Sequence, residues 1–229
     1  MQKKYNEKAI ITNKDIQKDF TYLSTVMITL DISYPAVKLI QNPSPENRIN
    51  RHYRLDALDF YRYASTTLFK GAINEYRDSI KNDFPFRPYD AVMKYFISLN
   101  GSCHLSSYTD RYEYTGGAHG NTIRSSATFD LKSGRQLELR DLFKRGANYR
   151  YDILKNITEQ AEKNLSENPG IYFEDYKQLI IENFNPKSFY LTPEALAVYY
   201  QQYEIAPYST GIVVFEIPYS KLEINPPRC

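Results

Sequence analysis

One long stretch of helical periodicity lies between runs of strand-like alternation, and this order limits the folds open to the chain. From Tyr22 to Tyr34, apolar residues alternate with polar ones, which predicts that the fold starts with a half-buried strand. Pro35 and the proline-rich cluster 42–45 interrupt the alternation and predict a loop. From Asp56 to Asn82, apolar residues recur every three or four positions without a proline, which predicts one amphipathic helix.

Alternating runs return after this helix. Tyr89–Asn100 and Cys103–Tyr114 flank an Asn100-Gly101 pair, which is typical of a tight hairpin turn. Thr122–Leu131 and a short run through Leu137 and Leu139 predict two more strands. These segments together predict an antiparallel meander.

The last part of the chain contains segments of helical periodicity and segments of strand-like alternation. Helical spacing covers Tyr149–Leu165 and Glu174–Phe184, and strand-like runs cover Ser188–Leu191, Ala195–Gln202 and Gly211–Ile217. Strands and helices do not alternate regularly along the chain. The order therefore predicts an α+β fold of mostly antiparallel sheets with helices packed on them.

Composition narrows the class of protein. Hydrophobic residues make up 42% and charged residues 24% of the 229 residues, as in ordinary globular proteins. A membrane-spanning helix needs about 20 apolar residues, and no run approaches that length, so we expect no membrane insertion by this segment. The net charge of +2 comes without a block of like charges, so we expect no nucleic-acid partner.

Carboxylates are concentrated in one segment near the C-terminus. Such a segment can attract a basic protein, and we select Glu174, Asp175 and Glu182 as candidate partner-binding residues. A solvated helix face is the other interpretation. The segment contains eight acidic residues (Glu159, Glu162, Glu167, Glu174, Asp175, Glu182, Glu194, Glu204) and three lysines (Lys163, Lys177, Lys187).

Tyrosine is abundant, with 22 Tyr and 12 Phe but no Trp. So many phenol rings cannot all be buried, and a ring with one polar end suits protein interfaces and sugar-binding clefts. Tyrosine also suits strands that are half-covered by a neighbouring layer. Composition alone leaves both uses open.

The two cysteines, Cys103 and Cys229, are too few for a zinc site. A single disulfide between them is possible in an exported protein, whereas both thiols stay reduced in a cytosolic one, and the sequence leaves the pairing open. The first residues, Met1 to Tyr5, are polar and show no secretion signal. This start fits either an intact cytosolic protein or a piece that has lost a leader or an anchor.

Three glycines lie close together in Tyr114-Thr115-Gly116-Gly117-Ala118-His119-Gly120. Glycines allow close backbone approach, so Tyr114, Gly116, Gly117 and His119 are candidate ligand-binding residues. The loop lacks the spacing of a phosphate-binding loop. A tight connection between strands, held by a hydrogen bond from His119, is the structural alternative.

Neither a metal nor a cofactor is expected. The only histidines are His52, His104 and His119, and none of them has the spacing of a paired metal ligand. No pair of carboxylates stands out as the acid and base of a glycosidase.

A second unusual stretch runs from Tyr199 to Tyr208. It predicts either a rigid turn fixed by Pro207 or a recognition surface of amphipathic side chains. For the second case the candidate ligand-binding residues are Tyr200, Gln201, Tyr203, Glu204 and Tyr208.

The sequence resembles the signature of a bacterial family of domains of unknown function. The resemblance rests on these two stretches and on two motifs between them, Asp130-Leu131-Lys132-Ser133-Gly134 and Leu139-Arg140-Asp141-Leu142-Phe143. That family forms the extracellular part of the lysozyme-sensing anti-sigma-V factor RsiV and the N-terminal part of the peptidoglycan deacetylase PdaC. The resemblance covers about Thr21 to Leu222. It implies two abutting subdomains, 15–125 and 126–229, the second similar to a small subdomain of the Hsp70-type ATPase.

The resemblance also implies an extracellular or cell-envelope location, with an anchor in a segment absent from this chain. We expect a non-catalytic recognition domain that binds a protein such as lysozyme or a cell-wall glycan. One alternative is a cell-wall hydrolase or deacetylase that uses His119 as base and Glu204 as acid or orienting group, which requires the two side chains to meet. A purely structural module is the other alternative.

Overall fold

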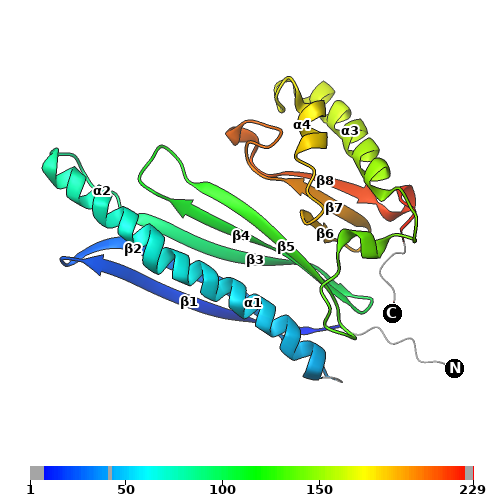
Figure 1. The fold of residues 1–229 in the computed structure, drawn as a ribbon, viewed down its shortest axis with the longest axis horizontal. Helices are drawn as coiled ribbons and strands as arrows, with labels where there is room; N and C mark the ends of the chain where they lie inside the picture. Colours follow the sequence, from blue (N-terminus) through cyan, green and yellow to red (C-terminus); the bar gives the residue numbers. More distant parts are fainter. Residues whose placement is uncertain (1–7, 41–42, 225–228) are drawn as a thin grey trace.

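The protein contains two β-sheets, each with its own helices, in a computed structural model that describes residues 8–40, 43–224 and 229 (Figure 1). Residues Met1 to Tyr5, which show no secretion signal, lie outside the described residues. Asn42 of the predicted proline-rich loop also lies outside them. The five-stranded sheet has the order β1-β2-β3-β4-β5, and the three-stranded sheet has the order β6-β7-β8. The strands are β1 (Ile10–Tyr22), β2 (Thr25–Lys38), β3 (Tyr89–Gly101), β4 (His104–Tyr114), β5 (Asn121–Asp130), β6 (Phe189–Leu191), β7 (Ala195–Tyr200) and β8 (Val213–Pro218).

Helices lie against both sheets and complete the predicted α+β fold, which is thereby confirmed (Figure 1). The long helix packs on the five-stranded sheet and connects β2 to β3, and these two strands are parallel. All other strand pairs are antiparallel. The helices are α1 (Pro43–Tyr63), a π-helical turn (Ala64–Leu68), α2 (Phe69–Lys81), α3 (Tyr149–Glu167) and α4 (Tyr176–Glu182). No helix in the described ranges is both long and apolar enough to cross a membrane.

The prediction that the fold starts at Tyr22 is wrong, because β1 precedes it. β1 is an edge strand that pairs along its length with β2 and exposes most of its side chains. Charged side chains such as Lys14 and Asp15 are typical of edge strands, where they discourage pairing with another chain. Such a strand carries little hydrophobic alternation, so the pattern did not predict it.

The three prolines expected to mark a loop, Pro35, Pro43 and Pro45, belong to regular elements instead. Pro35 lies within β2, opposite Asn13 of β1, and β3 pairs only with Ile28–Ile32 of β2. One edge of β2 is therefore free of a ladder partner at Pro35, where a missing N–H costs little. Pro45 lies in the first turn of α1, where the N–H has no partner within the helix.

The predicted hairpin is present, but its turn lies two residues further along. Gly101 pairs with His104, so Ser102 and Cys103 form the turn, and both have positive φ angles (52° and 60°). The Asn100 side chain instead hydrogen-bonds in both directions to the backbone of Ala9, at 2.9 Å each. The predicted short strand near Leu137 is also wrong: Gln136 makes a single bridge to Phe129, and Leu139–Leu142 is a 3-10 turn.

Each sheet is packed on its own hydrophobic core. Ile28, Leu30 and Met93 pack with Phe60 beneath α1 and α2. A second core lies between α3, α4 and the three-stranded sheet and includes the fully buried Phe215. The subdomain boundary at residue 125 stays a prediction.

Cys103 and Cys229 form a disulfide that ties the last residue of the chain to the β3–β4 turn. Their Cα atoms are 5.1 Å apart, within the usual range for a bridged pair. The sequence left open whether the two cysteines pair, and the structure shows that they do.

Candidate recognition surface

The glycine-rich stretch 114–120 and the tyrosine-rich stretch 199–208 meet where the two sheets join. The Gln201 side chain hydrogen-bonds twice to the backbone of Arg124 in β5, accepting from its N–H at 2.9 Å and donating to its carbonyl at 2.7 Å. The Gln202 side chain accepts from the N–H of Thr122 at 2.8 Å. Because β5 is an edge of the five-stranded sheet, these amides satisfy backbone groups that would otherwise be free.

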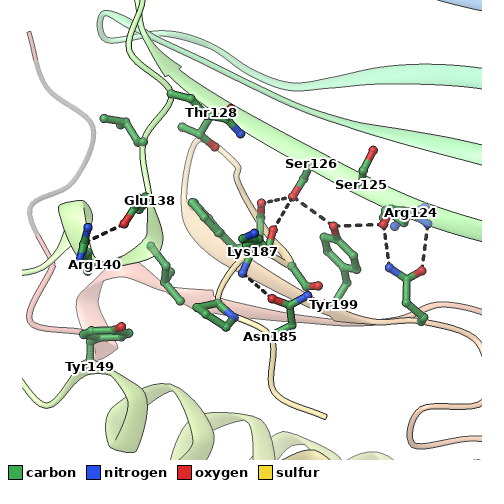
Figure 2. Close-up of a pocket in the computed structure, with 17 residues that line it drawn as sticks. Arg124, Ser125, Ser126, Thr128, Glu138, Arg140, Tyr149, Asn185, Lys187 and Tyr199 are labelled. Atoms are coloured by element: carbon green, nitrogen blue, oxygen red, sulfur yellow. Dashed lines mark hydrogen bonds and ion pairs between the residues drawn. The ribbon is translucent and has the colours of Figure 1, made fainter. Parts of the chain in front are cut away.

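Side chains on β5 extend this junction (Figure 2). Arg124 forms a bidentate ion pair with Asp110, at 2.7 Å for both contacts, and its guanidinium lies 4.0 Å from the centre of the Tyr108 ring. The Ser126 hydroxyl donates to the carbonyl of Phe189 and lies 3.2 Å from the Tyr199 hydroxyl. Gln201, Arg124 and Tyr199 therefore make contacts that hold the two sheets together.

Three aromatic rings from the two stretches form a partly exposed stack beside the junction. The rings of His119 and Tyr208 are 3.8 Å apart and nearly parallel, and the Tyr203 ring lies 5.9 Å from that of Tyr208. Tyr203 is 53% exposed, and His119 is also exposed. The structure thus brings together three of the candidate ligand-binding residues, of which His119 and Tyr203 are exposed and Tyr208 is half-buried.

The glycine loop is shaped by its neighbours. A Cβ atom at Gly120 would lie 2.3 Å from the Tyr112 ring, so only glycine fits without displacing that ring. Gly116 has a φ of 85°, in the region that favours glycine. Gly117 lies exposed between them. Tyr114 is half-buried and accepts a hydrogen bond from Arg87 at 3.3 Å.

Two other candidates have internal partners. The Glu204 carboxylate accepts the N–H of Gln201 at 2.6 Å, and burial, partly offset by this hydrogen bond, raises the pKa of Glu204. Tyr200 is buried in the second core and donates to the carbonyl of Ile180 at 2.8 Å. Across the described ranges no hydrogen bond or ion pair joins His119 to Glu204; the Nδ1 atom of His119 lies 3.1 Å from the carbonyl of Gly120.

The segment that carries the three candidate partner-binding carboxylates contacts the turn that carries Tyr203 and Tyr208. The N–H of Phe173, beside Glu174 and Asp175, donates to the carbonyl of Ile205 at 3.1 Å. The side chain of Asn183, beside Glu182, donates to the carbonyl of Glu204 at 2.7 Å. One backbone–backbone and one side chain–backbone hydrogen bond therefore hold the ends of the α4 segment against the turn that carries Tyr203 and Tyr208.

These carboxylates are exposed and keep their charge unneutralised. Lys177 pairs with Glu162 and Lys163 with Glu167, and no described cation pairs with Glu174, Asp175 or Glu182. We call the combined patch the recognition surface, and it consists of His119, Tyr203, Tyr208, Glu174, Asp175 and Glu182. No group of three or more potential metal ligands occurs in the part of the chain that the structure describes.

A separate cleft of about 740 Å³ lies between β5 and the segment that leads into β6 (Figure 2). Arg140, from the 3-10 turn after β5, and Lys187, from the loop before β6, line it. Lone basic residues in loops carry no spacing signal, so neither residue is predicted as a site residue from the sequence. Only the fold brings them to one cavity.

Comparison with known proteins matches the chain to two family models. Residues 23–122 match the family described as "Deacetylase PdaC", and residues 140–220 match "Protein of unknown function (DUF3298)". These matches confirm the family resemblance drawn from the sequence motifs.

Two curated relatives come from Bacillus subtilis (strain 168). The anti-sigma-V factor RsiV is 27% identical over 201 residues, which cover 83% of this chain and 62% of RsiV. The peptidoglycan-N-acetylmuramic acid deacetylase PdaC is 28% identical over 102 residues, which cover 42% of this chain and 21% of PdaC. The chain thus spans less than two thirds of either relative.

Solved structures of the DUF3298 family share the fold. A family member from Bacteroides fragilis has a TM-score of 0.68 at 19% identity, covering 93% of this chain and 92% of its own. Another from Pseudomonas aeruginosa PAO1 has a TM-score of 0.63 at 18% identity, covering 94% of each chain. Both support the α+β arrangement of Figure 1.

Proposed function

Because both parts of the chain match the domain family shared by RsiV and PdaC, we propose that it is a non-catalytic extracytoplasmic recognition domain. Its ligand is a basic protein such as a lysozyme, bound at the recognition surface. The domain works in the extracellular space or the cell envelope, anchored through a segment outside this chain.

The disulfide supports the location. Disulfides form and persist in oxidising compartments and are rare in the bacterial cytosol. Cys229 is exposed, so a reducing environment would reach the bridge from that side. A chain that works outside the cytoplasm keeps its last residue tied to the β3–β4 turn.

The observation that carries the proposal is an aromatic stack on a turn that contacts a segment whose carboxylates have no cation partner among the described residues. Exposed tyrosines provide the anchoring contacts of many protein interfaces, because they bury a large area with little loss of side-chain freedom. Glu174, Asp175 and Glu182 add negative charge without a cation partner on the described chain, which favours a basic partner and speeds its association.

The internal contacts of Glu204 support a non-catalytic role. A general acid needs to face its substrate, whereas the Glu204 carboxylate accepts from its own turn at Gln201. The alternative, a cell-wall hydrolase or deacetylase, needs His119 and Glu204 to act together. It predicts release of acetate or reducing sugar from peptidoglycan, and it predicts that His119→Ala abolishes that release.

Isothermal titration of the chain with a basic lysozyme, at low and at physiological salt, tests the proposed function. We expect saturable binding that weakens as salt rises, because screening reduces attraction between exposed charges. Absence of binding at both salt concentrations would contradict the proposal.

A further inference from the structure

The cleft beside β5 lies apart from the residues assigned to the recognition surface, since none of those six residues lines it (Figure 2). Its volume of about 740 Å³ is within the range of small-molecule sites, which hold a ligand the size of a short saccharide. Its walls come from four parts of the fold: β5, the segment 136–140 with the start of α3, the segment 185–189 that leads into β6, and the end of β7 with Gln201.

The charges in this cleft are positive in excess. Lys187 is exposed, and its ammonium has no carboxylate partner among the described residues. Arg140 is also exposed and uses its Nε to pair with Glu138 at 2.7 Å, which leaves its terminal nitrogens without a described partner. Glu138 also takes part in the capping box of the 3-10 turn, so its carboxylate already has partners. The lining of the cleft therefore suits an anionic group better than a cation.

The remaining walls offer neutral polar groups and a ring. Gln136 and Asn185 carry exposed side-chain amides that line the cleft, and the side-chain Oδ1 of Asn185 accepts the backbone N–H of Lys187 at 3.0 Å. Tyr149 lines the cleft and is held by a stacking contact with Phe143, at 5.1 Å between ring centres. Amides that hydrogen-bond to hydroxyls, beside a fixed aromatic ring, suit a sugar.

We propose that this cleft is a second binding site, which takes a saccharide bearing a carboxylate. Lys187 and Arg140 pair with the carboxylate, and the amides of Gln136 and Asn185 hydrogen-bond to the sugar hydroxyls. The buried side chains of Leu137, Leu139 and Phe189 form an apolar wall against which a sugar ring packs. Arg124 takes no part, because Asp110 holds both its Nε and a terminal nitrogen, whereas Arg140 contacts Glu138 through Nε.

A titration with two matched disaccharides tests the proposal. The first probe is N-acetylglucosamine linked to N-acetylmuramic acid, whose lactyl group carries a carboxylate. The second is chitobiose, which has two N-acetylglucosamine units and no carboxylate. We expect the carboxylated probe to bind at least tenfold more tightly than chitobiose, with chemical-shift changes at Lys187 and Arg140. Equal affinities, or no binding of either probe, would overturn the proposal.

Variants separate the site from general charge effects. Lys187→Ala is expected to weaken binding of the carboxylated probe at least tenfold, and Arg140→Ala to do the same. Lys155→Ala, an exposed lysine of α3 outside the cleft, removes the same charge and is expected to leave affinity unchanged. If Lys155→Ala and Lys187→Ala weaken binding equally, the site is not this cleft. Lysozyme binding by Lys187→Ala is expected to match the unmodified chain, which distinguishes this site from the recognition surface.

Discussion

The side-chain amide of Gln201 hydrogen-bonds to both the N–H and the carbonyl of Arg124, and so pairs with β5 as a further strand would. With Gln202 on Thr122, it joins the turn that carries Tyr203 and Tyr208 to the edge of the five-stranded sheet. The orientation of the aromatic stack therefore depends on backbone groups in the other sheet.

Replacing both glutamines tests this connection. Gln201→Ala with Gln202→Ala removes three hydrogen bonds to β5 and is expected to lower the free energy of unfolding by about 2–4 kcal/mol, at about 1 kcal/mol each. Urea unfolding followed by circular dichroism measures the change. Gln17→Ala, an exposed glutamine of β1, is the control and is expected to change stability little. A double variant as stable as the control would contradict the assigned role.

The disulfide is expected to contribute strongly to stability, because 126 residues separate its two cysteines. Closing so long a loop restricts the unfolded chain, and Cys229→Ser is expected to lower the free energy of unfolding by about 2–5 kcal/mol. Cys229 is exposed at the end of the chain, so this change leaves the core intact, whereas Cys103 is buried. Reductant is expected to lower the melting temperature of the original chain and not that of Cys229→Ser. The same response in both proteins would argue against the bridge.

The pKa of Glu204 predicts a pH dependence. Burial raises this pKa in the folded state, so folded Glu204 keeps its proton at pH values where the unfolded side chain has lost it. The free energy of unfolding therefore falls as pH rises through the interval between the two pKa values, and the penalty remains at neutral pH. Glu204→Gln removes this penalty.

Unfolding of Glu204→Gln and of the original chain, measured from about pH 4 to about pH 7, tests the sign of this effect. The variant is expected to gain stability relative to the original chain as pH rises. Glu159→Gln, on the exposed side of α3, serves as the control. If the free energies of unfolding of Glu204→Gln and of the original chain differ by the same amount at every pH in this range, the predicted effect is refuted.

The carboxylates of the recognition surface are expected to act through charge. Glu174→Gln, Asp175→Asn and Glu182→Gln together are expected to weaken lysozyme binding about tenfold at low salt and to flatten its salt dependence. The control changes three exposed carboxylates elsewhere, Asp19→Asn, Asp78→Asn and Asp83→Asn, and has the same net charge. Equal losses in both triple variants would indicate only a general effect of net charge.

The predictable part of the fold follows from strong hydrophobic periodicity. β2, α3 and β8 were predicted because each carries an apolar face against a core. β1 was missed, since an edge strand with both faces largely in water has little alternation to detect. The early start of α1 at Pro43 was missed because prolines usually end helices, although the first turn tolerates them.

The candidate site was predictable only in part. The sequence selected His119, Tyr203 and Tyr208 from two segments far apart, and the fold stacks their rings. Tyr200 was selected with them but points into the second core, because strand alternation places it on the opposite side from Tyr199. Local composition does not reveal which face of a short, fully buried strand carries function.

Binding of a basic lysozyme to Tyr208→Ala and His119→Ala tests the central claim most directly. Each change removes one ring of the partly exposed stack, whereas Tyr151→Ala removes a 62% exposed tyrosine from α3, outside the recognition surface. Isothermal titration is expected to show at least tenfold weaker binding for Tyr208→Ala and His119→Ala and unchanged binding for Tyr151→Ala. Lysozyme binding of unchanged affinity in Tyr208→Ala and His119→Ala would contradict the proposed recognition surface.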